Sequence, residues 1–117
     1  MKRKHMPARY ETTRQGVKLG GRTLYVDVGR DSDGVVRSIF LDTYKTGTEQ
    51  RALVEVIARL MSIALQYDVP LAKLTKLIRG TKFNPHGIVT VNGKVCEKVR
   101  FASSPLDYVA KHVEEAS

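Results

Sequence analysis

The sequence has a single cysteine, three scattered histidines and no long apolar run, and each scarcity excludes a class of protein. Because Cys96 stands alone, internal disulfides, a dithiol redox pair and a cysteine-based zinc site within one chain are excluded. No stretch approaches the roughly 18 apolar residues of a membrane span, and the basic start continues into polar chain rather than into a signal peptide. We therefore expect a soluble, cytoplasmic protein without membrane contact.

Familiar catalytic motifs are also missing. There is no Gly-rich dinucleotide fingerprint, no Walker phosphate loop, no zinc-protease His-Glu-x-x-His and no nucleophile elbow. The segment Asp31-Ser32-Asp33-Gly34 begins like a calcium loop, but its glycine falls at the fourth position, so it is interpreted as a hairpin turn. Cys96 lies in a strand-like run and is expected to be a structural thiol. We expect no catalytic residue, no metal, no cofactor and no enzymatic activity of the chain on its own.

The chain of 117 residues is 42% hydrophobic and 27% charged, which is typical of one globular domain. Its net charge of +8 is concentrated in two places. Residues 1–15 carry Lys2, Arg3, Lys4, Arg9 and Arg14 against Glu11, and residues 71–82 carry Lys73, Lys76, Arg79 and Lys82. A localised field of this sign attracts nucleotide phosphates or nucleic acid, although basic surfaces without such a role are common. Residues 1–14 lack periodicity and are expected to be a basic extended arm, with one domain over 15–117.

The first third of that domain alternates apolar and polar residues. In 22–30 this pattern places Leu24, Val26 and Val28 on one face of a strand. After the Asp-Gly turn, 35–42 returns as the paired strand. Within it we expect one face to hold Val35, Arg37, Ile39 and Leu41, and the other to hold Val36 and Phe40. This region is therefore predicted to form a small antiparallel meander.

A long central helix is predicted to run to about Gln66, opened within residues 46–49 by a capping box between Thr46 and Glu49. Its polar residues form one narrow stripe, which we expect to face solvent: Arg51, Glu55, Arg59, Ser62 and Gln66. Because the remaining arc is apolar, the helix should be sandwiched between the sheet and another helix, with Leu60 buried.

Two more helices and a hairpin follow. In 71–79, we expect one apolar face and one basic face, the apolar face holding Leu71, Leu74, Leu77 and Ile78. Asn92-Gly93 between β-prone runs predicts a late hairpin. Ser104, Pro105 and Asp107 predict a capped start of the last helix. The fold class is thus α+β: a small antiparallel sheet packed on a long central helix, with two further helices and a late hairpin.

Two segments are candidate ligand sites. Lys45, Thr46, Gly47 and Thr48 precede the central helix, where a lysine, hydroxyls and free amides suit a phosphate, although plain helix capping explains them too. Lys82, Phe83 and His86 lie in a loop after the basic helix. A cation, an aromatic face and an imidazole together can hold a nucleotide, unless Phe83 only fills the core.

Read in order, several segments resemble the C-terminal region of adenosylcobalamin-dependent (class II) ribonucleotide reductases, the TSCPD-domain family. They are Met6-Pro7-Ala8-Arg9, Gly20-Gly21, 24–29, Ile39-Phe40, Lys45-Thr46-Gly47, 62–71, 81–87 and 104–108. Three positions depart from the family pattern. Asp68 stands for a glycine, Ser38 for a glutamate, and Pro105-Leu106 for the Cys-Pro of the family's name motif, of which Ser104 and Asp107 remain.

The resemblance implies a fold and an accessory role rather than reductase activity, because family enzymes hold their radical cysteine, cobalamin site and substrate barrel in a separate large domain. It suggests a free-standing phage or prophage copy, which binds a nucleotide, another anionic small molecule or a reductase subunit. Whether the chain forms a homo-oligomer is left open by the sequence. The alternatives are a small basic nucleic-acid-binding protein and a ligand-binding or host-interaction protein. Single-stranded nucleic acid would contact Lys2, Arg3, Lys4, Lys73, Lys76 and Arg79.

Overall fold

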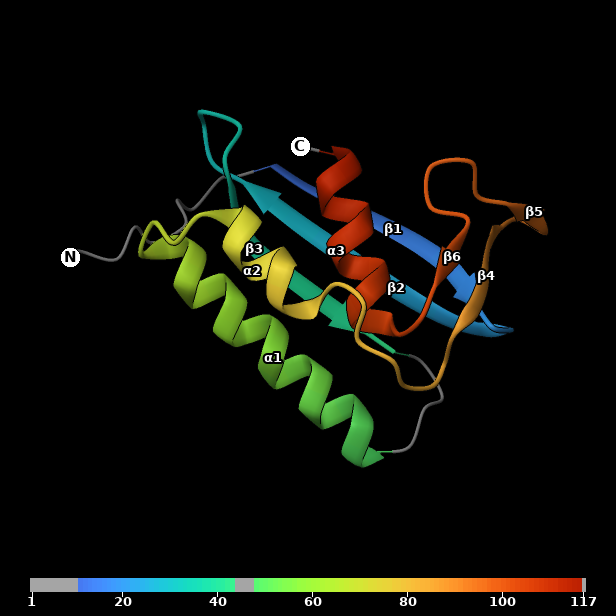
Figure 1. The fold of residues 1–117 in the computed structure, drawn as a ribbon. Coiled ribbons are helices and arrows are strands. Elements are labelled where there is room, and N and C mark those ends of the chain that lie inside the picture. Colours follow the sequence, from blue (N-terminus) through green and yellow to red (C-terminus); the bar gives the residue numbers. More distant parts are fainter. Residues whose placement is uncertain (1–10, 44–47, 117) are drawn as a thin grey trace.

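The computed structural model describes residues 11–43 and 48–116, which form an α+β fold with one antiparallel sheet and three helices (Figure 1). The sheet has six strands in the order β3-β2-β1-β4-β5, with β6 paired to β4. The elements are β1 (Glu11–Leu19), β2 (Arg22–Arg30), β3 (Val36–Asp42), α1 (Thr48–Gln66), α2 (Leu71–Ile78), β4 (Gly87–Val91), β5 (Lys94–Val95), β6 (Phe101–Ala102) and α3 (Pro105–Ala116). The predicted fold class is confirmed.

The N-terminal meander forms because alternation gives each strand one apolar face. Leu24, Val26 and Val28 of β2 are fully buried, as predicted. The Asp31–Gly34 turn joins β2 to β3, and the carboxylate of Asp31 accepts hydrogen bonds from the amides of Asp33 and Val35. β1 begins at Glu11, so residues 11–14 of the expected arm belong to the sheet, and residues 1–10 lie outside the described structure.

The predicted faces of β3 are wrong at its first residues. Val36 is buried and Val35 is exposed, whereas Ile39 and Leu41 face the core and Phe40 faces solvent as expected. The cause is a bulge, because Gly29 pairs with Ser38 while Arg30 pairs with Val36. One extra residue in β3 reverses the alternation on its N-terminal side.

α1 ends at Gln66, as predicted, and the predicted cap at Thr46 lies outside the described residues. The orientation of α1 differs from the prediction. The expected solvent stripe is wrong at Ser62 and Gln66, which are 6% and 7% exposed. The expected burial of Leu60 is also wrong, since its exposed fraction is 60%. The residues of α1 that enter the core are Val54, Ala58, Met61 and Leu65.

The physical reason lies at the edge of the sheet. β3 is an edge strand, so its outward amides and carbonyls lack a strand partner. The Ser62 hydroxyl lies 2.9 Å from the Ile39 amide and 3.0 Å from the Ile39 carbonyl, and the Gln66 side-chain amide donates to the Arg37 carbonyl. Side chains of α1 thus replace a missing strand. The helix packs on β3, and in the described structure its outer face is uncovered, so the predicted sandwich is wrong.

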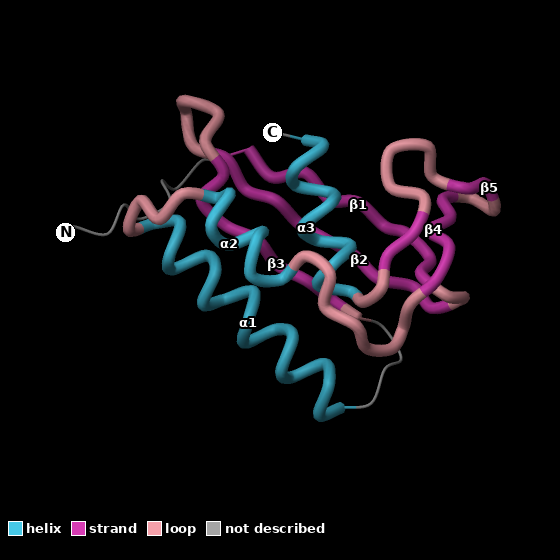
Figure 2. Tube along the Cα trace, in the orientation of Figure 1, coloured by secondary structure: helices cyan, strands magenta, loops and turns pink. Residues whose placement is uncertain are grey.

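The two shorter helices lie against one another, and α3 crosses the face of the sheet (Figure 2). Leu74 and Ile78 of α2 are buried, as predicted, but Leu77 is exposed and Thr75 takes the buried place instead. Asn92 and Gly93 adopt positive φ angles of 53° and 79° in the β4–β5 hairpin, as the Asn-Gly signal predicts. None of the helices described is long and apolar enough to cross a bilayer.

Candidate functional site

The loop of residues 81–86 connects α2 to β4 and is held by three separate parts of the fold (Figure 2). Its Phe83 amide donates to the Ser103 carbonyl at 3.2 Å. The His86 carbonyl lies against Gly20 so closely that a Cβ at Gly20 would come within 2.3 Å of the carbonyl oxygen. The Gln50 side-chain amide, from the first turns of α1, donates to the Asn84 carbonyl. The loop is therefore a fixed junction between α1, the β1–β2 turn and the start of α3.

The three residues of this loop that the sequence selected have different surroundings. Lys82 and His86 are exposed, so a cation and an imidazole are accessible to a ligand. Phe83 is half-buried and packs against the core, which leaves only part of its ring for stacking on a base. The loop thus offers charge and hydrogen-bond donors more readily than an aromatic platform.

The second predicted ligand segment, residues 45–48, leads directly into α1, which contacts the 81–86 loop. Lys45, Thr46 and Gly47 lie outside the described residues, and Thr48 is the first residue of α1. Gln50, two residues later, makes the contact to Asn84. Two segments selected independently in the sequence are thus linked through the first turns of α1.

The basic residues of α2 face away from the core. Lys73 and Lys76 are exposed, as the sequence predicts. Arg79 is exposed too, but its guanidinium pairs with the Glu114 carboxylate of α3. The two lysines are therefore more readily available to a phosphate than Arg79 is, and Lys2, Arg3 and Lys4 lie outside the described structure.

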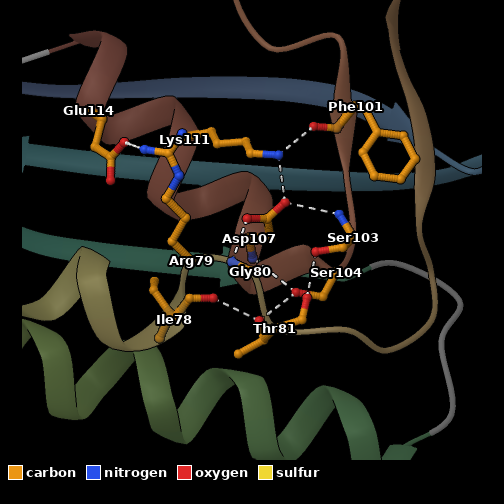
Figure 3. Close-up of polar contacts among 10 residues, drawn as sticks. All are labelled: Ile78, Arg79, Gly80, Thr81, Phe101, Ser103, Ser104, Asp107, Lys111 and Glu114. Carbon is orange, nitrogen blue, oxygen red and sulfur yellow. Dashed lines mark hydrogen bonds and ion pairs between the residues drawn. The ribbon is translucent and has the colours of Figure 1, made fainter.

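A buried carboxylate joins α2 to α3 (Figure 3). Asp107 is 1% exposed and accepts hydrogen bonds from the amides of Gly80 at 2.8 Å and Ser103 at 2.9 Å. The Lys111 ammonium lies 2.9 Å from the same carboxylate. Burial by itself raises the pKa of Asp107, but Lys111 and the two amides outweigh burial, and the pKa is lowered. Because all of these interactions are made within the chain, the carboxylate has a structural role.

The hydroxyl of Ser104 completes this cluster. As the predicted N-cap, it accepts a hydrogen bond from the Asp107 amide at 2.9 Å. The same hydroxyl lies 2.8 Å from the Thr81 hydroxyl. The Ser103 hydroxyl donates to the Thr81 carbonyl at 2.7 Å. These hydrogen bonds connect the start of α3 to Thr81, the first residue of the 81–86 loop. The cluster of Ser103, Ser104 and Asp107 therefore positions the candidate site.

The profile of the TSCPD domain matches residues 1–117 of this sequence. The chain belongs to the TSCPD domain family. Three similar proteins are each named vitamin B12-dependent ribonucleotide reductase: one from Agrobacterium fabrum at 34% identity, one from Bradyrhizobium diazoefficiens at 33% and one from Rhodopirellula baltica at 28%. The matches cover 94–95% of this chain but only 8–10% of the relatives. No solved structure matches the chain.

This TSCPD domain is thus related to a small part of much larger reductases, and the predicted family resemblance is confirmed. Ser104 and Asp107, the remnants of the family's name motif, are the cap and the buried carboxylate of α3. In this chain these two residues hold helices together.

Sequence reasoning missed a further group of ionisable residues beside α3. Cys96, Tyr108 and His112 line one small cavity together with Lys98 and Glu115. Burial raises the pKa of Tyr108, with the Cys96 thiol adding to it, and burial lowers the pKa of His112, with Arg30 and Lys98 adding to it. The spacing of Tyr108 and His112 by four residues signals a shared helix face, but their meeting with Cys96 depends on the hairpin.

Proposed function

We propose that this TSCPD domain is a non-catalytic accessory module related to ribonucleotide reductase, which binds a phosphate-bearing ligand such as a nucleotide where loop 81–86 meets α1. The observation that carries the proposal is the contact between Gln50 and Asn84, which links the two predicted ligand segments. Lys82 and His86 are exposed beside this contact. Cationic side chains near the start of a helix favour bound anions, since the helix dipole and free amides point there.

Removing the lysine should weaken nucleotide binding without affecting the fold. We expect Lys82→Ala to lower the affinity for a deoxynucleoside triphosphate by roughly tenfold at low salt, because a hydrogen bond to a charged group is lost. The loss should shrink at high salt, where the charges are screened. Isothermal titration calorimetry measures the affinity, with Lys45→Ala and His86→Ala as further variants. Lys94→Ala, an exposed lysine on β5, is the matched control and should bind like the wild type.

Equal affinity for wild type and Lys82→Ala would remove the loop from the site. The alternative partner is a reductase subunit, since the relatives carry this domain within a reductase chain. If titration with nucleotides gives no heat, and this protein co-sediments with a purified vitamin B12-dependent reductase, the result would favour the reductase as the partner instead.

Single-stranded nucleic acid is the second candidate ligand, supported by the exposure of Lys73 and Lys76 on α2. If these lysines and the N-terminal arm follow a phosphate backbone, log affinity should fall against log salt by up to about 0.7 per contact. Deleting residues 1–5 removes Lys2, Arg3 and Lys4, so the slope should become shallower by roughly 2. Fluorescence anisotropy of a labelled oligonucleotide measures this slope. If the full chain and the truncated chain show the same slope, the N-terminal arm does not bind the phosphate backbone.

A further inference from the structure

A small cavity lies between α3, β1 and the segment that follows β5. Its volume is about 190 Å³, and its lining includes Gln15, Cys96, Lys98, Tyr108, His112 and Glu115. A water takes roughly 30 Å³ in the liquid, and sites for drug-sized ligands start at roughly 300 Å³. The cavity therefore has room for a small ion or a few waters, but not for a nucleotide.

The most buried residue of the lining is Tyr108, which is 1% exposed. Burial raises the pKa of its hydroxyl, and within the described part of the chain this hydroxyl makes no hydrogen bond. Buried polar groups are hydrogen-bonded in the great majority of cases, so a donor left unpaired at a cavity needs an explanation. A ligand that accepts a hydrogen bond from Tyr108 supplies one.

The charges around the cavity favour an anion as this acceptor. Tyr108 and His112 stack one turn apart on α3, with ring centroids 5.6 Å apart. Burial lowers the pKa of His112, and the charged groups that lower it further are two cations, Arg30 of β2 and Lys98. Lys98 also lines the cavity, and no ion pair of its ammonium occurs among the residues described. The acidic residue of the lining, Glu115, is exposed.

We propose that this cavity binds a small inorganic oxyanion, such as phosphate or sulfate. Its donors would be the Tyr108 hydroxyl, the Lys98 ammonium and the His112 imidazole. An oxyanion offers enough acceptor oxygens for all three, whereas a neutral carbonyl has only two lone pairs. The Cys96 thiol is a further, weaker donor, and its position is fixed because its amide donates to the Val89 carbonyl at 2.8 Å. The inference is independent of the proposed nucleotide site, because no residue of the lining belongs to loop 81–86 or to α1.

Oxyanion binding is coupled to the protonation of His112. Burial and the two cations hold the pKa of His112 below its ordinary value, so the imidazole is neutral at pH 7. An oxyanion beside the ring stabilises the imidazolium, so binding should raise this pKa, and the oxyanion should bind more tightly as the pH falls. The other ionisable groups around the ring are Cys96, Tyr108, Glu115, Lys98 and Arg30. None of these residue types has an ordinary pKa between about 5.5 and 7.5, so His112 is the group that titrates in this range.

Nuclear magnetic resonance of the full chain tests the proposal, with sulfate as the probe because its charge is constant over this pH range. The imidazole signals of His112 are assigned by their loss in His112→Gln. Against sodium chloride at equal ionic strength, sodium sulfate should move these signals with a dissociation constant of about 0.1 to 10 mM. Because one charge-assisted hydrogen bond is gained, sulfate should bind about tenfold more tightly at about pH 5.5 than at about pH 7.5.

Four variants test the roles of the lining residues. Tyr108→Phe removes only the hydroxyl, so it should weaken sulfate binding about tenfold without lowering the melting temperature measured in chloride. Lys98→Ala should also weaken binding about tenfold, whereas Lys94→Ala, an exposed lysine on β5, is the matched control and should bind like the wild type. Glu115→Gln removes a like charge and should strengthen binding by about two- to fivefold.

The same spectra separate this cavity from the proposed nucleotide site, because His86 reports on loop 81–86. Sulfate that moves no His112 signal, or equal affinities of the wild type, Tyr108→Phe and Lys98→Ala, would overturn the proposal. A deoxynucleoside triphosphate should leave the His112 signals unchanged, because the cavity has no room for a nucleoside. If the triphosphate moves them as sulfate does, the cavity is not a site for a free oxyanion.

Discussion

Replacing Leu65 by alanine is expected to lower the free energy of unfolding by about 2 to 5 kcal/mol. Leu65 is 3% exposed and lies in the core, so the change removes buried apolar contacts and leaves a cavity. Denaturant unfolding followed by circular dichroism measures the difference, provided that the slope against denaturant is unchanged.

Leu60→Ala is the matched control, because it makes the same chemical change five residues earlier in the same helix. Leu60 is exposed, so its replacement should change the stability of the monomer by no more than about 0.5 kcal/mol. Equal costs at the two positions would mean that α1 is oriented differently from the structure.

Replacing Asp107 by alanine should cost about 2 to 4 kcal/mol, since it leaves the amides of Gly80 and Ser103 and the Lys111 ammonium without their acceptor. The lowered pKa of Asp107 also gives the loss a defined pH dependence. A carboxylate whose pKa is lower in the folded chain stabilises it above the unfolded value of about 3.9, and this contribution disappears as pH falls through the folded pKa. The gap in stability between wild type and Asp107→Ala should therefore be full at neutral pH and narrow in acid.

Thermal melts of both proteins from neutral pH down to about pH 3 measure this gap. Glu97→Ala is the control, because Glu97 is an exposed carboxylate in the loop before β6, and its cost should be small at every pH. A gap that stays constant into acid would show that the charge of Asp107 does not contribute, and that the cap geometry alone stabilises α3.

The elements that could be predicted from the sequence are those specified within a few residues. The alternation of Leu24, Val26 and Val28, the turns at Gly34 and Gly93, and the cap by Ser104 all appear where the pattern placed them. Each depends on a strand period, a positive φ or a hydrogen bond to a residue close in sequence. The candidate ligand segments were also visible locally, as a lysine with hydroxyls and as a basic loop. Their link through Gln50 and Asn84 was not, since it joins residues that are distant along the chain.

By itself, then, the sequence determined the α+β class, the helix ends, the turns and the family resemblance, because local backbone preferences and recognisable segments carry that information. Only the tertiary structure decided which side of α1 is buried. A hydrophobicity pattern assumes that a helix turns its most apolar side inward, but α1 covers a sheet edge, where the unpaired backbone of β3 needs polar partners. Ser62 and Gln66 therefore lie inside and Leu60 lies outside, because leaving buried amides and carbonyls unpaired would cost more than exposing a leucine.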